Sequence, residues 1–388
     1  MHELGSILEC WRRPGGATGG AVLATVVHVR GSAYRRPGAR MLVLGDGSRI
    51  GTISGGCLET DVVRRAWWWT DEGATVRVFD STVEDAARDF GLGCNGVVTV
   101  LLERVDTPST RSLLAFLDAQ QDRREGSVVA TVVRADAASG YVVGEHVLHD
   151  AVGMPKGASG ALGVAVLDSV HVTLLEKRSR LVHLDGADVF VEWVAPPQRL
   201  FVFGAGQDAI PVATMASMLG WSVVVADSHP AFLTASRFPM ASRLFPLGSD
   251  ADIGDLGITR ADAVVVMTHN YPQDRMLLPQ LLAARPCYLG LLGPRTRAEK
   301  MFAEIGADLR ADFVHAPVGL DIGGDQPEGI ALSIVAEIQC ALHGQMGGRL
   351  RQRKGAIHAP ALEQGRERAP RPWRPEQTVA PSCGLAHA

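Results

Sequence analysis

The 388-residue sequence predicts an α/β protein in which a strand-rich α+β domain precedes a Rossmann-like, doubly wound parallel sheet. Three observations lead to this fold class. Short β-branched and alternating runs separated by glycine turns fill the first half. Strands and helices alternate after the prolines Pro196 and Pro197. A turn of the form G-x-G-x-x-A follows the first strand of that second half, as it does in dinucleotide-binding folds.

The first half contains strand-like runs such as AVLATVVHV, RMLVLG, TVRVF, GVVTVLLE, SVVATVV and ADVFVEWV. Two helices are expected between them, over residues 57–69 and 112–121; in the first, apolar residues recur at helical spacing. The first helix ends in three consecutive tryptophans, Trp67 to Trp69, which span about 200° of its circumference. A single buried stripe is narrower than this, so at least one indole is expected outside the core.

The second half begins with RLFVFGAGQDA. In such turns the first glycine, here Gly204, permits the tight bend, Gly206 lets a phosphate approach the backbone, and Ala209 allows the helix to pack closely. Asp227 ends the following strand, where a carboxylate can bind a ribose or another vicinal diol. The pattern predicts the fold but does not specify the ligand, because a Rossmann turn can also serve packing alone.

Three further loops follow strand ends in the second half. MTHN carries His269, LLGPR leads to Arg295 at a helix start, and DIGGDQPEG precedes the last helix. Open α/β sheets bind ligands at the carboxyl ends of their strands, so these loops and Gln207 of the glycine turn are expected to form one crevice. The alternative is that His269 only forms hydrogen bonds within its loop and that Arg295 is a solvated surface charge.

Composition and charge exclude several classes of protein. The net charge of −4 and the 46% hydrophobic content predict a soluble multi-domain protein with no global attraction to nucleic acid or to an anionic membrane. No secretory signal pattern is present, and no apolar stretch approaches the about 20 residues of a membrane span, so we expect a cytoplasmic protein. The domains are expected at residues 1–195 and 196–345, followed by a disordered basic, proline-containing tail over 346–388.

The stretch IGTISGGCLETD places Cys57 behind two glycines and at the start of a predicted helix. A helix N-terminus favours a thiolate, and the free amides of a glycine loop can hold an anion. The alternative is an inert core thiol. None of the six cysteines belongs to a C-x-x-C pair, which disfavours a structural zinc site and a disulfide framework.

Two long motifs together resemble one known family. The run GSAYRRPGARMLV followed by SGGCLE is similar to the amino-terminal signature of the XdhC/CoxI family, the accessory proteins of xanthine dehydrogenase and related molybdenum hydroxylases. GAG, DSHPAF, MTHN, YLGLLGPR and PVGLDIGGDQPEGIALSIVAEI are similar to the carboxy-terminal domain of the same family, in order and spacing. The resemblance extends over nearly the whole chain up to residue 343.

The resemblance implies a chaperone and not a turnover enzyme. Members of the family bind the molybdenum cofactor (Mo-molybdopterin), protect it while a cysteine desulfurase supports its sulfuration, and deliver it to the apo molybdenum hydroxylase. It also implies a homodimer, to which the exposed tryptophan would contribute. The competing interpretations are an NAD(P)-dependent oxidoreductase that uses the GAGQDA turn, and a pure interaction scaffold.

The cofactor carries a phosphate and an oxomolybdenum anion, so its receptor needs amides, arginines and a soft donor. Cys57 is the expected molybdenum contact or sulfur relay, and Cys94 is a weaker candidate because Asn95 replaces the glycine usual in the family. The first domain offers Gly31, Ser32, Arg35, Arg36, Arg40, Ser54, Gly55, Gly56 and Cys57. For the phosphate end of the cofactor the second domain offers Gly204, Gly206, Gln207, Asp227, His269 and Arg295. We expect both sets of residues to line one interdomain cleft.

The chain departs from the residues common in the family at three positions. Gln207 stands in place of a histidine, Asn270 in place of an aspartate and Gly329 in place of a glutamate. Gln207 and Asn270 still offer hydrogen bonds. A mechanism that requires an ionisable group at either position would therefore not transfer to this chain.

Overall fold

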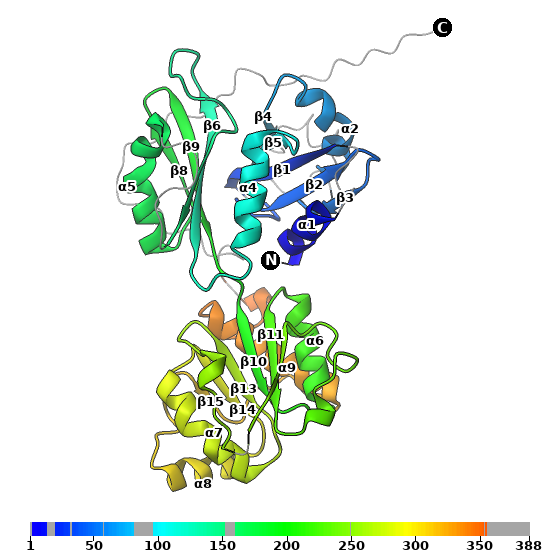
Figure 1. Ribbon diagram of the computed structural model, residues 1–388, viewed down its shortest axis with the longest axis vertical. Helices are drawn as coiled ribbons and strands as arrows, with labels where there is room; N and C mark the ends of the chain where they lie inside the picture. The colour runs from blue at the N-terminus through cyan, green and yellow to red at the C-terminus, as the bar shows by residue number, and fades with distance from the viewer. Residues whose placement is uncertain are drawn as a thin grey trace. The chain divides into compact units, whose positions relative to one another are not determined.

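The computed structural model describes residues 2–13, 20–31, 33–56, 58–80, 96–151, 160–248, 250–352 and 354 (Figure 1). These residues form two compact units that divide between Pro196 and Pro197. The first unit is built on antiparallel sheets and the second on a parallel sheet with helices, which confirms the predicted fold class. Most of the predicted tail, residue 353 and residues 355–388, lies outside the described residues.

The first unit contains two antiparallel sheets. The five-stranded sheet has the order β3-β2-β1-β5-β4, and the four-stranded sheet has the order β7-β6-β9-β8. The strands are β1 (Ala21–Gly31), β2 (Arg40–Leu44), β3 (Arg49–Gly51), β4 (Thr75–Asp80), β5 (Gly96–Arg104), β6 (Ser127–Ala135), β7 (His146–Asp150), β8 (Arg180–Leu184) and β9 (Ala187–Val194). The helices are α1 (His2–Arg12), α2 (Glu59–Trp69), α4 (Pro108–Ala119) and α5 (Ala161–Glu176).

Both helices predicted in this half are present, with shifted ends. α2 begins at Glu59 and buries Val62, Ala66 and Trp69 at helical spacing. α4 begins four residues before the expected start, because Thr107 accepts a hydrogen bond from the amide of Thr110 and Pro108 occupies the first turn. The local capping residues therefore set this boundary more precisely than apolar periodicity does.

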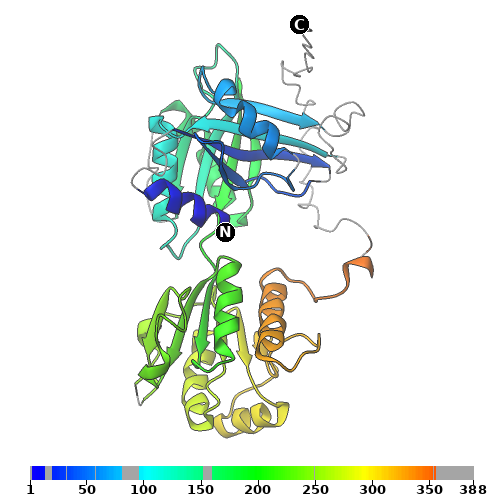
Figure 2. The ribbon, with the colours of Figure 1, turned by 90° about the vertical axis from the view of Figure 1, so that its right-hand side faces the viewer.

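The core of the first unit joins its two sheets through helices. Apolar residues of α1 and α4 pack with residues of β1, β2, β6, β7 and β9 in one cluster (Figure 2). Two buried polar pairs reinforce this junction. Arg40 of β2 donates to both carboxylate oxygens of Glu192 of β9, and His146 of β7 lies 2.9 Å from the Glu103 carboxylate of β5.

The second unit is a six-stranded parallel sheet with the order β12-β11-β10-β13-β14-β15. In chain order this is 3-2-1-4-5-6, the arrangement of the Rossmann fold. The strands are β10 (Arg199–Phe203), β11 (Ser222–Asp227), β12 (Arg243–Pro246), β13 (Ala263–Val266), β14 (Tyr288–Leu291) and β15 (Val314–His315). The helices are α6 (Ala209–Met218), α7 (Tyr271–Ala284), α8 (Arg295–Ile305) and α9 (Pro327–Leu342).

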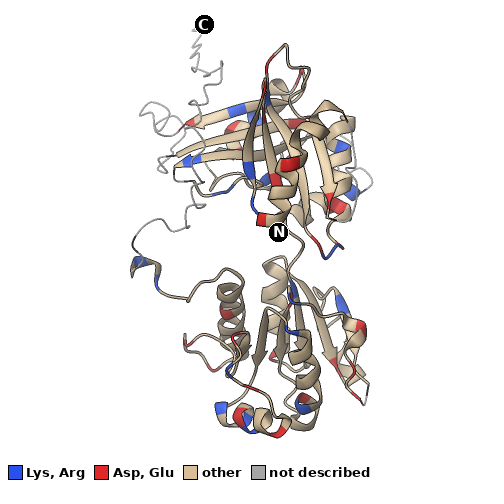
Figure 3. Cartoon of the chain, turned by 90° about the vertical axis from the view of Figure 1, so that its left-hand side faces the viewer, with Lys and Arg blue, Asp and Glu red and all other residues tan. Residues whose placement is uncertain are grey.

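Helices cover both faces of this parallel sheet. α6 and α9 pack on one face, and α7 and α8 pack on the other (Figure 1). The central strands are therefore continuous apolar runs, as in β10, where four consecutive residues from Leu200 to Phe203 are buried. Basic and acidic side chains are interspersed over both units (Figure 3). Within the described ranges, no helix has the length and apolar character needed to cross a membrane.

Candidate functional site

The glycine turn of the second unit lies at the point where the strand order reverses, between β10 and β13. Gly204 has a φ of 117°, and a β-carbon added there would lie 2.3 Å from the carbonyl oxygen of Met267, just after β13. Only glycine therefore permits the turn to pack against the following loop. This reversal is the usual ligand position of open α/β sheets.

Asp227 ends β11, as predicted, but its carboxylate already has protein partners. One oxygen accepts a hydrogen bond from the amide of Ala205 in the glycine turn at 2.7 Å, and the other accepts one from the amide of His229 at 2.7 Å. The residue is 7% exposed. In this arrangement Asp227 holds the turn in place instead of presenting a free carboxylate to a diol.

A second carboxylate lies beside Gly206. Asp208 pairs with His269 at 2.7 Å, and its other oxygen would be 2.6 Å from a β-carbon added at Gly206. His269 adopts a left-handed backbone conformation with a φ of 56°. Sequence reasoning did not single out Asp208. The negative charge of Asp208 lies where a phosphate would approach the turn, so an anion can bind there only after the Asp208 side chain rotates away.

The two arginines after β14 differ in their surroundings. Arg295 is exposed at the first position of α8, where a guanidinium can reach an anion at the carboxyl edge of the sheet. Arg297 instead pairs with the buried carboxylate of Asp274 at 2.8 Å and lies over the ring of Tyr271. Arg295 is therefore the one of the two that remains available for a ligand.

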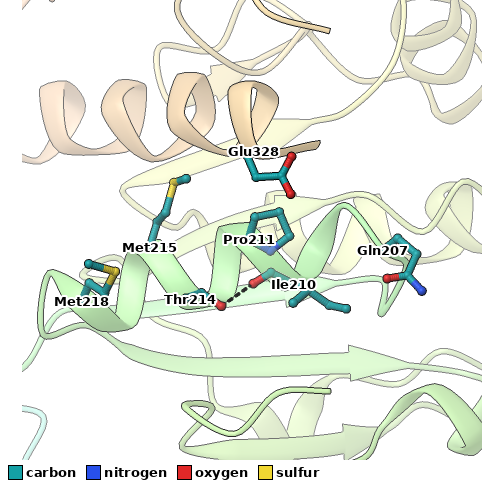
Figure 4. A pocket seen from close by; sticks show the side chains of 7 residues that line it. All are labelled: Gln207, Ile210, Pro211, Thr214, Met215, Met218 and Glu328. Atoms are coloured by element: carbon teal, nitrogen blue, oxygen red, sulfur yellow. Dashed lines mark hydrogen bonds between the residues drawn. The ribbon is translucent and has the colours of Figure 1, made fainter. Parts of the chain in front are cut away.

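A shallow groove of about 410 Å³ runs along α6 from the glycine turn (Figure 4). Gln207 lies at one end of this groove, Met218 at the other, and Glu328 of α9 faces it. The remaining lining residues are Ile210, Pro211, Thr214 and Met215. The groove is mainly apolar, and no motif in the sequence indicated it.

The loop before α2 is organised around the buried carboxylate of Glu59. This carboxylate accepts hydrogen bonds from the amides of Ile53 and Ser54, at 3.1 and 2.7 Å, and from the hydroxyls of Thr52 and Ser54. Burial by itself would raise the pKa of Glu59, but these hydrogen bonds outweigh burial and lower the pKa to about 2. Glu59 thus occupies the anion position of its own loop.

Ser54 also ties down the chain on both sides of Cys57. The amides of Gly56 and Leu58 each donate to the Ser54 hydroxyl oxygen at 3.2 Å. The amide and the hydroxyl of Ser54 are therefore both hydrogen-bonded within the loop and the start of α2, whereas Gly55 and Gly56 remain exposed. Cys57 itself lies outside the described residues, as do Ser32 and Cys94.

The arginines of the GSAYRRPGAR motif have three different environments. Arg35 pairs with Glu3, and Arg40 is buried in its pair with Glu192. Arg36 is exposed, and its guanidinium forms no hydrogen bond or ion pair within the described part of the chain. Gly31 is exposed at the end of β1. Arg36 is thus the arginine of this motif with its donors available to a ligand.

Cys10, Cys287 and Cys340 form no disulfide within the described residues, and burial, followed by the charge of Asp262, raises the pKa of Cys287 to about 11. No group of three metal-ligating side chains occurs among the described residues.

Sequence comparison identifies the family. A profile described as "XdhC Rossmann domain" matches residues 200–338, and one described as "XdhC and CoxI family" matches residues 17–80. A Bacillus subtilis protein named as a probable xanthine dehydrogenase subunit is 35% identical over 321 residues, which cover 82% of this chain and 92% of that protein. The molybdenum cofactor insertion chaperone PaoD of Escherichia coli is 26% identical over 82% of each chain.

A solved structure shares the fold. A crystal structure from Bacillus halodurans, described as a xanthine dehydrogenase, superposes with a TM-score of 0.72 at 31% identity, covering 89% of this chain and 97% of that one. The glycine turn, the SGGC loop and these matches confirm the resemblance read from the motifs: the chain belongs to the XdhC and CoxI family.

Proposed function

We propose that the protein is a maturation chaperone for the molybdenum cofactor. It binds Mo-molybdopterin as cargo, protects it while a cysteine desulfurase supports its sulfuration, and delivers it to an apo molybdenum hydroxylase of the xanthine dehydrogenase type. The similarity to an insertion chaperone over most of both chains supports this role. The observation that carries the proposal is the glycine loop before α2, whose exposed Gly55 and Gly56 lie in a segment held by Glu59.

In this proposal the first unit binds the metal-containing part of the cargo. Gly31, Ser32, Arg36 and Gly55 contact the anionic groups beside Gly56, whose amide already donates to Ser54, and Cys57 provides a soft thiolate next to the molybdenum. Ser54 acts through the loop, because its side chain is already used there. We leave Arg40 out of the cofactor contacts, because Glu192 occupies its guanidinium in the core.

The second unit is proposed to bind the phosphate end of the cargo at the crevice formed by Gly204, Gly206, Gln207, His269 and Arg295. Asp227 supports the turn from behind. The Asp208 side chain must rotate away when a phosphate approaches Gly206, and the exposed Arg295 then offers the compensating positive charge.

A pterin assay tests the first part of the proposal. Protein purified from cells that make molybdopterin is expected to contain bound pterin, and Cys57→Ala is expected to lower pterin retention or the activity of the client hydroxylase without unfolding the chain. Cys287→Ser serves as the control, because its thiol pKa is raised. Unchanged retention and client activity in Cys57→Ala would remove Cys57 from the site.

Gly206→Val tests the second part. The larger side chain should block the approach of a phosphate and lower cofactor affinity while the oligomeric state stays the same. If binding survives but transfer to the client fails, the crevice is a docking site and the cofactor belongs to the first unit alone.

The alternative function is an NAD(P)-dependent oxidoreductase, which the Rossmann strand order and the GAGQDA turn favour. The carboxylate of Asp227, which already accepts hydrogen bonds from the amides of Ala205 and His229, opposes it. A change of NADH fluorescence on addition of the protein, in the absence of any bound pterin, would support the oxidoreductase instead.

A further inference from the structure

An exposed aromatic ring lies on the glycine loop of the first unit. Tyr34 is 70% exposed. A β-carbon added at Gly55 would lie 3.6, 3.8 and 3.9 Å from Cγ, Cδ2 and Cδ1 of this ring. The ring therefore lies beside Gly55, with room for about one β-carbon between them, while most of its surface faces solvent.

The loop under this ring is rigidly held. Ser54 is the neighbour of Gly55. Its amide donates a hydrogen bond of 2.7 Å to the carboxylate of Glu59, and its hydroxyl donates a second one to the same carboxylate, which has no solvent exposure. The loop beside the ring is therefore pre-ordered, so a ligand that binds there loses less free energy to ordering the backbone.

The arginines that follow Tyr34 in the sequence differ in whether a described residue pairs with them. Of the three arginines in the motif, Arg35 and Arg40 are paired with Glu3 and Glu192, and Arg36 is exposed with no ion pair to a described residue. An open aromatic face combined with an unpaired guanidinium suits a flat heterocycle that carries an anionic group.

We propose that Tyr34 is a stacking platform for the pterin ring system of the cargo and that Arg36 binds the anionic dithiolene end, the end assigned to this unit above. This inference rests on the proposed function and adds the residues that distinguish a pterin from other anions. Stacking needs the aromatic face and not the phenolic hydroxyl. The platform should therefore also bind a plain pterin that lacks phosphate, dithiolene and molybdenum.

Binding to the full chain is measured with two probes: a plain fluorescent pterin, and molybdopterin released from a purified molybdoenzyme. Tyr34→Ala is expected to weaken both about tenfold, which corresponds to about 1.4 kcal/mol. Tyr34→Phe should bind both probes as the wild type does. Arg36→Gln should weaken only the molybdopterin probe, which carries the anionic dithiolene, by about fivefold, and the exposed Arg111→Gln should change the affinity for neither probe.

The outcomes separate the two proposals. Wild-type affinity of Tyr34→Ala for both probes overturns the platform, and an equal loss in Tyr34→Phe assigns the effect to the hydroxyl and overturns stacking. Plain pterin binding that depends on Tyr34, without retention of molybdopterin, keeps the platform and refutes the chaperone function. A wild-type protein that binds neither probe refutes both.

Discussion

At Glu59, a single carboxylate determines the shape of the loop that precedes α2. The side chain has no solvent exposure, and its carboxylate accepts hydrogen bonds from residues 52–54. An acidic residue in the first turn of a helix is ordinarily explained by the helix dipole. Here the carboxylate reaches back into the loop, so its loss affects the loop more than the helix.

Stability should depend on pH through Glu59. Its pKa is lowered from 4.5 to about 2, so the contribution to stability, about 3 kcal/mol, is present above pH 4.5 and is lost as the pH falls towards 2. Glu59→Gln should remove this contribution at neutral pH and flatten the pH dependence, as measured by denaturant unfolding of the full chain. The exposed Glu72→Gln is the control, and equal effects of the two substitutions would contradict the assignment.

At the scale of elements, contacts between distant segments hold each unit together. In the second unit the turn after β10 packs against the loop after β13, and in the first unit β2 is joined to β9 by a buried ion pair. Neither contact is local in sequence. For each contact we predict that a substitution lowers the free energy of unfolding strongly, whereas a substitution of the same residue type outside the contact has a small effect.

Gly204→Ala should destabilise the second unit by more than about 2 kcal/mol, because the new methyl group would meet the backbone of Met267 and the φ of 117° is strained for alanine. Gly206→Ala is the matched variant. It meets only the end of the Asp208 side chain, which can rotate, so its effect on thermal unfolding should be small. Similar losses at the two glycines would disprove the packing explanation.

Arg40→Ala should cost about 3–5 kcal/mol, because it leaves the buried carboxylate of Glu192 without its partner. The double variant Arg40→Met with Glu192→Leu should recover most of this loss. Arg13→Ala, which removes an exposed pair with Glu9, should change the free energy of unfolding by less than about 0.5 kcal/mol. A double-mutant cycle with no coupling energy between Arg40 and Glu192 would show that the ion pair does not join the sheets.

At the scale of the whole molecule, several apolar side chains remain exposed on helices. Trp68 of α2 is 73% exposed, which confirms that one of the three tryptophans lies outside the core. Leu175 of α5 and Met218 of α6 are 83% and 66% exposed. α6 is apolar on all sides, a pattern more usual for a buried helix.

We expect a homodimer in which Trp68 contributes to the interface. Light scattering at micromolar concentration should give twice the mass of the chain, and Trp68→Ser should shift the protein towards the monomer. Leu175→Ser is the comparison, and dissociation by this variant alone would place the interface on α5. A monomer mass for the wild type rules out the dimer at these concentrations.

The sequence by itself determined the fold class, helices α2 and α4 of the first unit and the positions of both glycine loops, whereas α1 and α5 were not predicted. These features depend on local rules: residue periodicity, turn chemistry and the order of strands and helices. The start of α4 was missed because a cap involves single hydrogen bonds, such as that of Thr107, which apolar periodicity does not detect.

Only the tertiary structure decided which candidate residues remain available to a ligand. Arg36 has no ion pair to a described residue, whereas Arg40 finds its partner 152 residues along the chain, and Asp227 reaches a turn 22 residues before it. Asp208 meets His269 across 61 residues and changes the charge next to Gly206. A side chain's availability depends on partners brought together by packing, so motif spacing identifies the loops of the site but not the groups in them that are free to bind.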